Sequence, residues 1–167
     1  MRVSLLPKAI FQKLTDITPE YLRACDIRLL MLDFDNTVLP YTSNEPTEAL
    51  LAWLEGMKAA GVTLCVVSNS KKSRAKTFCE QNQIGCVRHA RKPFPKGIKE
   101  CLRRYDTAPE QAALVGDQIF TDVLGANGAG IRSILVKPIH LHNIWLKLRH
   151  IAEQPCIYFA RNRRVKL

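Results

Sequence analysis

The chain has 167 residues, of which 47% are hydrophobic and 24% charged, and its formal net charge is +10. This length favours one domain with a sizeable core, and the composition is ordinary for a globular protein. No apolar run approaches the roughly 18 residues that a membrane-spanning helix needs. The first residues also lack the apolar region and cleavage site of a secretory signal. We therefore expect a cytoplasmic protein, with peripheral attachment to the inner face of the membrane as the alternative.

The six cysteines contain no CxxC pair, and several lie inside apolar runs such as TLCVVS. We therefore predict reduced thiols in a cytosolic protein, with a disulfide framework as the alternative.

The positive charge is concentrated in residues 71–104, which hold eleven Lys or Arg against two Glu, a local balance of +9. The rest of the chain holds fourteen basic and thirteen acidic residues. A charge run of this kind is usually a solvated face, but it also indicates anionic partners such as phosphates, nucleic acid or acidic lipid. A smaller basic group closes the chain: Arg161, Arg163, Arg164 and Lys166.

Apolar runs alternate with helical patterns along the chain. The run at 27–33 is almost continuously apolar, as in a strand buried on both faces. Further strands are predicted at 62–68, 84–89, 112–117 and 131–136. Helices are predicted at 48–60, 71–81, 95–105 and 119–127. Gly61 ends the first, Ser70 caps the second, and Gly128 and Gly130 stop the fourth. A last helix is predicted around an apolar stripe of Leu141, Ile144, Trp145 and Leu148.

This alternation predicts an α/β fold, a Rossmann-like three-layer sandwich around a mostly parallel five-stranded sheet. We interpret the whole chain, residues 1–167, as one domain. Residues 1–26 form an N-terminal extension, 27–137 the catalytic core, and 138–167 a C-terminal helix and basic tail.

Two aspartates, Asp33 and Asp35, follow the first buried run directly. A carboxylate in such a place is costly unless a cation pairs with it. Ser68 and Asp117 end the second and fourth predicted strands. In open α/β sheets, ligands bind outside the carboxyl ends of the strands. These side chains should therefore meet in one cleft, where carboxylates and nearby basic residues suit a Mg²⁺ ion and a phosphate.

Four motifs stand at these strand ends in order: DFDNT (33–37), SN (68–69), KP (92–93) and GDQIFTD (116–122). In these motifs the chain resembles the haloacid dehalogenase (HAD) superfamily. It is similar in particular to the subfamily IIIA, YqeG-like phosphatases, a group that also resembles mitochondrial phosphatidylglycerophosphatase. The leading segment LLPKAIFQKLTDITPEYL is similar to that group too. Asn36 stands where many members have Gly, and Asn tolerates left-handed backbone well.

The resemblance implies a catalytic role for three residues. Asp33 is the expected nucleophile, which forms an aspartyl-phosphate. Asp35 is the expected general acid and base. Lys92 is expected to offset the phosphate charge and to hold Asp33 ionised. Lys96 is the alternative lysine, but it falls in the first turn of a helix, where exposure is the simpler interpretation.

The remaining site residues follow from the same resemblance. Asp33, the backbone carbonyl of Asp35, Asp117 and Asp122 are the expected Mg²⁺ ligands. Ser68 and the backbone N–H of Asn69 are expected to hold phosphate oxygens at a helix start, and Thr37 to support the loop or the phosphate. Ordinary capping is the alternative for Ser68 and Asp122, and a plain turn hydroxyl the alternative for Thr37.

The motif spacing leaves no room for a cap domain. Only 30 residues separate Thr37 from Ser68, and 23 separate Ser68 from Lys92. We therefore expect a capless, open site, which suits a bulky phosphomonoester better than a small metabolite.

Three functions remain open at this stage. The first is a Mg²⁺-dependent phosphatase of a phospholipid such as phosphatidylglycerophosphate, in contact with an anionic membrane. The second is a phosphatase of another phosphomonoester: a nucleotide, a nucleic-acid end, a phosphoprotein or a metabolite. The third is a non-enzymatic basic module that binds RNA or lipid. Nucleic acid is not excluded as a partner, and the sequence leaves the oligomeric state open.

Overall fold

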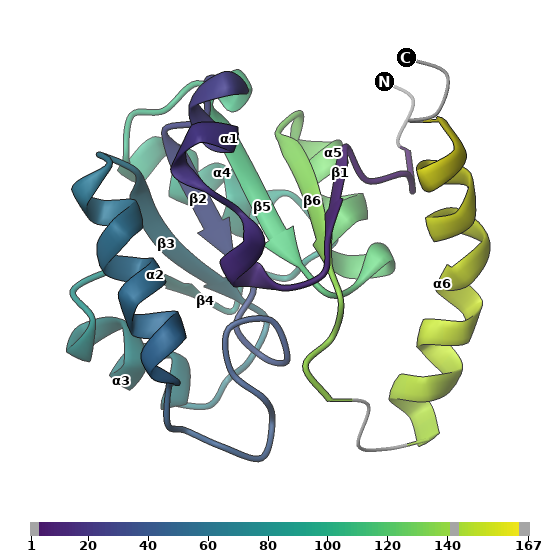
Figure 1. Ribbon diagram of the computed structural model, residues 1–167, viewed down its shortest axis with the longest axis horizontal. Coiled ribbons are helices and arrows are strands. Elements are labelled where there is room, and N and C mark those ends of the chain that lie inside the picture. Colours follow the sequence, from purple (N-terminus) through teal and green to yellow (C-terminus); the bar gives the residue numbers. More distant parts are fainter. Residues whose placement is uncertain (1–3, 141–143, 164–167) are drawn as a thin grey trace.

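The structure is a computed structural model that describes residues 4–140 and 144–163. Its centre is a six-stranded sheet in the order β1-β6-β5-β2-β3-β4 (Figure 1). Every pair of neighbouring strands is parallel. The strands are β1 (Ala9–Phe11), β2 (Leu29–Leu32), β3 (Thr63–Ser68), β4 (Gly85–Arg88), β5 (Ala112–Gly116) and β6 (Arg132–Val136).

Helices cover both faces of this sheet, which gives the expected three layers (Figure 1). The helices are α1 (Pro19–Ala24), α2 (Glu48–Ala59), α3 (Arg74–Gln81), α4 (Lys96–Arg104), α5 (Leu124–Ala129) and α6 (Ile144–Arg163), with short turns η1 (Leu14–Asp16), η2 (Pro109–Gln111) and η3 (Ile119–Val123). Apolar side chains of α1, α2 and α3 fill the core on one face. Those of α4 and α5 fill the core on the other face.

The predicted α/β architecture is confirmed, but the predicted five strands are one too few. The additional strand, β1, lies in the N-terminal extension and pairs with β6 at the edge of the sheet. It has three residues, which is too short to show a periodic pattern. The extension also contains η1 and α1, so it packs as part of the domain.

Two predicted helix boundaries are wrong. The helix after β3 begins at Arg74 rather than Lys71, and its cap position is Ser73. Ser70 instead accepts a hydrogen bond from the Lys72 N–H in the preceding turn. The helix after β5 runs through Gly128 and ends at Gly130, whose φ of 79° is left-handed. Gly130 is thus a C-terminal cap of the kind that glycine favours.

The last predicted helix is confirmed as α6, which spans 20 residues. Of its predicted stripe, Leu141 lies outside the described residues, and so do the side chains of Ile144 and Trp145. The tail residues Arg164 and Lys166 also lie outside them. Within the described chain, none of the helices combines the length and apolarity needed to cross a bilayer.

The register of the central strands sets the position of the site. Leu32, the last residue of β2, pairs with Val66 of β3 and Val115 of β5. Asp33, Ser68 and Asp117 therefore leave the sheet within two positions of one another at its carboxyl edge. This is the edge at which we expected them to meet.

A candidate phosphatase active site

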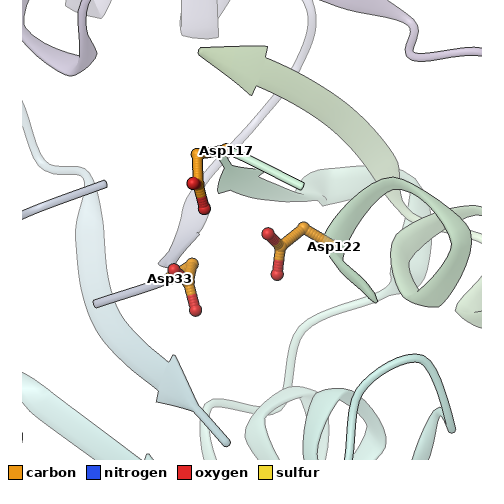
Figure 2. A group of neighbouring side chains, drawn as sticks. All are labelled: Asp33, Asp117 and Asp122. Atoms are coloured by element: carbon orange, nitrogen blue, oxygen red, sulfur yellow. The ribbon is translucent and has the colours of Figure 1, made fainter. Parts of the chain in front are cut away.

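Three buried carboxylates meet at the carboxyl edge of the sheet. Asp33 follows β2, Asp117 follows β5, and Asp122 lies in η3; their side chains converge in Figure 2. One oxygen from each lies within 4.8 Å of the others, and all three residues are buried. Three carboxylate oxygens in one small space are costly without a cation and match the ligands that Mg²⁺ prefers.

Lys92 brings a positive charge into contact with this carboxylate cluster. Its ammonium Nζ lies 2.6 Å from Oδ1 of Asp33 and 2.7 Å from Oδ1 of Asp122. Its side chain is only 1% exposed. One ammonium and three ionised carboxylates give the site a formal net charge of −2. The second oxygen of Asp33, Oδ2, is buried and has no hydrogen-bond partner. These residues fit a divalent cation.

The charges shift the pKa of both partners in the Lys92–Asp33 pair. Burial, with a smaller contribution from the Asp122 carboxylate, raises the pKa of Asp33 to about 7 against the opposing pull of the Lys92 ammonium. Burial alone would lower the pKa of Lys92, but the Asp122 and Asp33 carboxylates outweigh it and raise this pKa. Lys92 therefore stays charged at neutral pH.

Asn69 fixes the backbone of Lys92. Its amide Oδ1 accepts from the Lys92 N–H at 2.7 Å, and its Nδ2 donates to the Lys92 carbonyl at 2.8 Å. The Asn69 side chain thus joins the second motif to the third, a contact that sequence reasoning missed. Lys96, the alternative lysine, is exposed at the start of α4.

The local backbone fixes the position of the Asp122 carboxylate. Its Oδ2 accepts from the N–H of Gln118 at 3.1 Å, and this ties the carboxylate to the start of η3. A Cβ at Gly116 would lie 2.3 Å from the Asp122 Cγ, so glycine is required there for the carboxylate to reach the cluster. The buried Glu153 of α6 accepts a hydrogen bond from the N–H of Ile119 at 2.8 Å, which anchors the start of η3 to α6.

Asn36 connects the first motif with Asp117. Its φ of 70° confirms the expected left-handed backbone. Its Nδ2 donates to Asp117 Oδ2 at 3.4 Å, and its Oδ1 accepts from the His140 N–H at 2.9 Å. The residue is fully buried. Asn36 therefore links the chain after β6 to the carboxylate cluster, a role for which a glycine would have no side chain.

Asp35 does not contribute its carboxylate to the cluster. The side chain instead forms an ion pair with Arg74, with 3.2 Å between Oδ1 and Nη1. The residue between the two aspartates, Phe34, is fully buried and packs against Phe78. The ligand expected from Asp35 was its backbone carbonyl, so that expectation stays a prediction.

Ser68 and Thr37 are both buried at this edge. The Ser68 hydroxyl accepts from the N–H of Ser70 at 3.1 Å, as a capping residue would. The Thr37 hydroxyl oxygen has no hydrogen-bond partner. Thr37 also lines a pocket of about 620 Å³ with the start of α2 and the segments after β1 and β6. The three carboxylates do not line that pocket, so it is a neighbour of the site and not the site itself.

The fold and the site together are those of a HAD-type hydrolase. A family model described as HAD-hydrolase-like matches residues 89–138, which include Lys92 and both aspartates of the fourth motif. Among solved structures, the chain is similar to 3-deoxy-D-manno-octulosonate 8-phosphate phosphatase of Yersinia pestis, with a TM-score of 0.54, 17% identity and coverage of 77% of this chain and 72% of that one. It is also similar to the cobalt-bound deoxy-D-mannose-octulosonate 8-phosphate phosphatase of Haemophilus influenzae, with a TM-score of 0.55, 13% identity and coverage of 74% and 75%.

A curated relative narrows the class to a family. The chain is 35% identical over 134 residues to "Probable phosphatase YqeG" of Bacillus subtilis, a match that covers 80% of this chain and 78% of that protein. The chain therefore belongs to the YqeG-like family of HAD-type phosphatases. This removes the non-enzymatic module from the three functions that the sequence left open.

Proposed function

We propose that the protein is a Mg²⁺-dependent phosphomonoesterase that acts through an aspartyl-phosphate on Asp33. The observation that carries this proposal is the state of the Asp33 carboxylate. Lys92 holds one of its oxygens at 2.6 Å, and the other is buried without a hydrogen-bond partner. A carboxylate that is fixed in this way has a single oxygen left to attack phosphorus, and its orientation is set before substrate arrives.

In the first step, an oxygen of Asp33 forms a bond to phosphorus while the bond from phosphorus to the leaving alcohol breaks. Asp35 gives its proton to the leaving oxygen, so that an alcohol and not an alkoxide departs. The Lys92 ammonium offsets negative charge on the phosphoryl oxygens and on Asp33.

In the second step, Asp35 takes a proton from a water molecule, whose oxygen attacks the same phosphorus. The bond between phosphorus and Asp33 breaks, which restores the carboxylate and releases inorganic phosphate. Asp33, Asp117, Asp122 and the backbone carbonyl of Asp35 would hold Mg²⁺, which supplies charge neutralisation at the phosphoryl group when bound.

The phosphate oxygens need donors on the side of the site away from the carboxylates. We assign this role to the Ser68 hydroxyl and the backbone N–H of Asn69, at the turn before α3. Thr37 has a buried hydroxyl without a partner, which supports a role in holding the loop or the phosphate.

For the substrate we propose a phospholipid such as phosphatidylglycerophosphate, at an anionic membrane surface. One support is the open site: within the described chain, a loop, α2 and β3 fill the sequence between Thr37 and Ser68, and no cap domain stands there. A second support is the basic stretch, residues 71–104, in which nine of the eleven Lys and Arg are exposed. Each basic residue near an anionic bilayer contributes about 1 kcal/mol of attraction.

A third support is the outer face of α6. Four large apolar side chains on it are 50–64% exposed: Leu148, Ile151, Tyr158 and Phe159. Their spacing places them on one side of the helix, opposite the buried Glu153 and Ile157. Glu153 is the one acidic residue in the sequence of α6, which also contains four Lys or Arg. An exposed apolar face on a helix whose sequence is basic and whose one carboxylate is buried is typical of helices that lie in a membrane interface.

The second candidate is a phosphatase of another phosphomonoester, on a nucleotide, a nucleic-acid end, a protein or a metabolite. The exposed basic stretch suits a nucleic-acid substrate as well as it suits an anionic membrane, because RNA would also bind it. The outer face of α6 favours the lipid, since apolar side chains gain nothing from a phosphate backbone.

A substrate panel separates the two candidates. Release of inorganic phosphate is measured from phosphatidylglycerophosphate in vesicles, nucleotides, sugar phosphates, phosphopeptides and 5′-phosphorylated RNA, with Mg²⁺ or with EDTA. We expect turnover of the lipid to exceed that of every other substrate and to stop in EDTA. Preferential turnover of a water-soluble phosphate would exclude the lipid and leave the phosphatase chemistry standing.

A further inference from the structure

Arg74 is the first residue of α3 and belongs to the basic stretch, yet it does not face solvent. Its side chain is 11% exposed, whereas nine other basic residues of the stretch are exposed. The guanidinium lies over the ring of Phe34, 5.1 Å from its centroid. Phe34 is the residue between the two aspartates in the sequence of the first motif. A cation in such a position is partly desolvated and held by its neighbours.

The guanidinium connects Asp35 to the loop that follows it. Its Nη1 donates to Asp35 Oδ1 at 3.2 Å and to the carbonyl of Tyr41 at 3.4 Å. Its Nη2 donates to the carbonyls of Pro40 at 2.7 Å and Ser43 at 2.5 Å. A guanidinium carries five N–H donors in a fixed planar fork, so Arg74 can hold the carboxylate and three loop carbonyls in one geometry, more partners than the three donors of an ammonium could serve.

Asp35 depends on this contact for its orientation. Its side chain is 17% exposed, and the bond to Arg74 is the one hydrogen bond that its carboxylate makes to the described residues. With Oδ1 held by Arg74, Oδ2 remains for a proton. Proton transfer requires a donor about 2.6–3.2 Å from the leaving oxygen, so free rotation of the carboxyl would reduce the productive fraction.

We infer that Arg74 is a positioning residue that aims the Asp35 carboxyl at the leaving-group oxygen and fastens the loop at residues 40–43 beside it. This inference rests on the proposed role of Asp35 as general acid. Arg74 itself exchanges no proton, because a guanidinium stays protonated. Its effect should therefore be confined to the two steps in which Asp35 gives or takes a proton, of which the first can be measured alone.

The test compares two leaving groups under single-turnover conditions, with enzyme in excess, so that the released alcohol reports the first step alone. 4-Nitrophenolate departs without a proton, whereas the alkoxide of an alkyl phosphate such as glycerol 3-phosphate needs one. For Arg74→Ala we expect a loss of at least about tenfold on the alkyl phosphate and of no more than about twofold on 4-nitrophenyl phosphate. Equal losses on both substrates would show a merely structural role and overturn the inference.

Two further variants keep the test decisive if Arg74→Ala does not fold. Arg74→Lys retains the charge but not the fork, so we expect a loss of about threefold or more on the alkyl phosphate alone. Equal losses on both substrates, or no loss on either, would overturn the inference. Lys76→Ala is the matched control, because Lys76 lies on the same helix, is exposed and pairs only with Glu80 among described residues. It should leave both rates unchanged.

Asp35→Asn distinguishes failure of this inference from failure of the proposed function. A selective loss on the alkyl phosphate in Asp35→Asn without one in the Arg74 variants would overturn the role of Arg74 alone. If Asp35→Asn shows no selective loss, the general-acid role of Asp35 is wrong, and the inference falls with it.

Discussion

The ammonium of Lys92 lies between two carboxylates, 2.6 Å from Asp33 and 2.7 Å from Asp122. It therefore joins the proposed nucleophile to a proposed metal ligand that is 89 positions away in the sequence. The geometry explains how one lysine can hold two buried acids in place. It also explains why the site still requires a second cation, since the third acid, Asp117, adds another negative charge.

Lys92→Ala should reduce phosphatase turnover by at least about tenfold, because the phosphoryl group and Asp33 would lose their fixed positive charge. Lys96→Ala is the matched control. Lys96 is exposed, so its removal should change turnover by no more than about twofold. Steady-state rates with 4-nitrophenyl phosphate measure both effects, and the reverse ranking would show that the wrong lysine has been assigned.

The position of the carboxylates could be predicted from the sequence, because strand ends are local features. Asp33 and Asp117 each follow an apolar run, and parallel strands bring such ends together. The choice of Lys92 over Lys96 followed from the Lys-Pro motif. The structure places Lys92 against Asp33 and leaves Lys96 exposed.

The contacts of Arg74 and Asn69 could not be predicted in the same way. Arg74 lies 39 positions from Asp35, within a charge run that resembles a solvated face. Asn69 lies 23 positions from Lys92, and no local pattern marks an amide that will bind a distant backbone. Strand β1 was missed for a different reason, since three residues at a sheet edge carry too little periodicity.

The metal-free protein should become less stable as pH rises. Burial raises the pKa of Asp33 to about 7 in the folded state, well above its value of about 4 in the unfolded chain. The folded state then binds the proton more tightly, so the stability present below about pH 4 is lost as pH rises through about 7. Melting temperatures in EDTA at pH 5, 6, 7 and 8 measure this trend.

Asp33→Asn removes the titrating group and should flatten that dependence. The exposed Asp106 provides the control, since Asp106→Asn should leave the wild-type slope intact. Mg²⁺ should stabilise the wild type at pH 8 more than it stabilises Asp33→Asn. A wild-type melting temperature in EDTA that does not fall between pH 5 and 8 would contradict the buried-charge account.

Gly116→Ala should weaken metal binding. The added Cβ would lie 2.3 Å from the Cγ of Asp122, so that carboxylate must leave its place beside Lys92. We expect the Mg²⁺ concentration for half-maximal activity to rise by at least about fivefold. Gly56→Ala is the control, because a Cβ there meets nothing within 4 Å, and it should leave the Mg²⁺ requirement as in the wild type.

The double substitution Ile151→Ser and Phe159→Ser should separate membrane binding from catalysis. Both side chains are more than 60% exposed on α6. Losing their apolar area should reduce sedimentation with anionic vesicles by about tenfold, while turnover of 4-nitrophenyl phosphate stays within about twofold. Leu51→Ser removes a partly exposed apolar side chain from α2 and should leave vesicle binding intact. Undiminished vesicle binding by the double variant would exclude α6 as the docking surface.

The covalent role of Asp33 is the central claim, and trapping the intermediate tests it most directly. The protein is mixed with a ³²P-labelled phosphomonoester and Mg²⁺, quenched in acid within milliseconds, digested and analysed by mass spectrometry. We predict labelled phosphate on the peptide that contains Asp33, absent from Asp33→Asn and from samples in EDTA. Turnover by Asp33→Asn near the wild-type rate, or label on a different residue, would contradict the account.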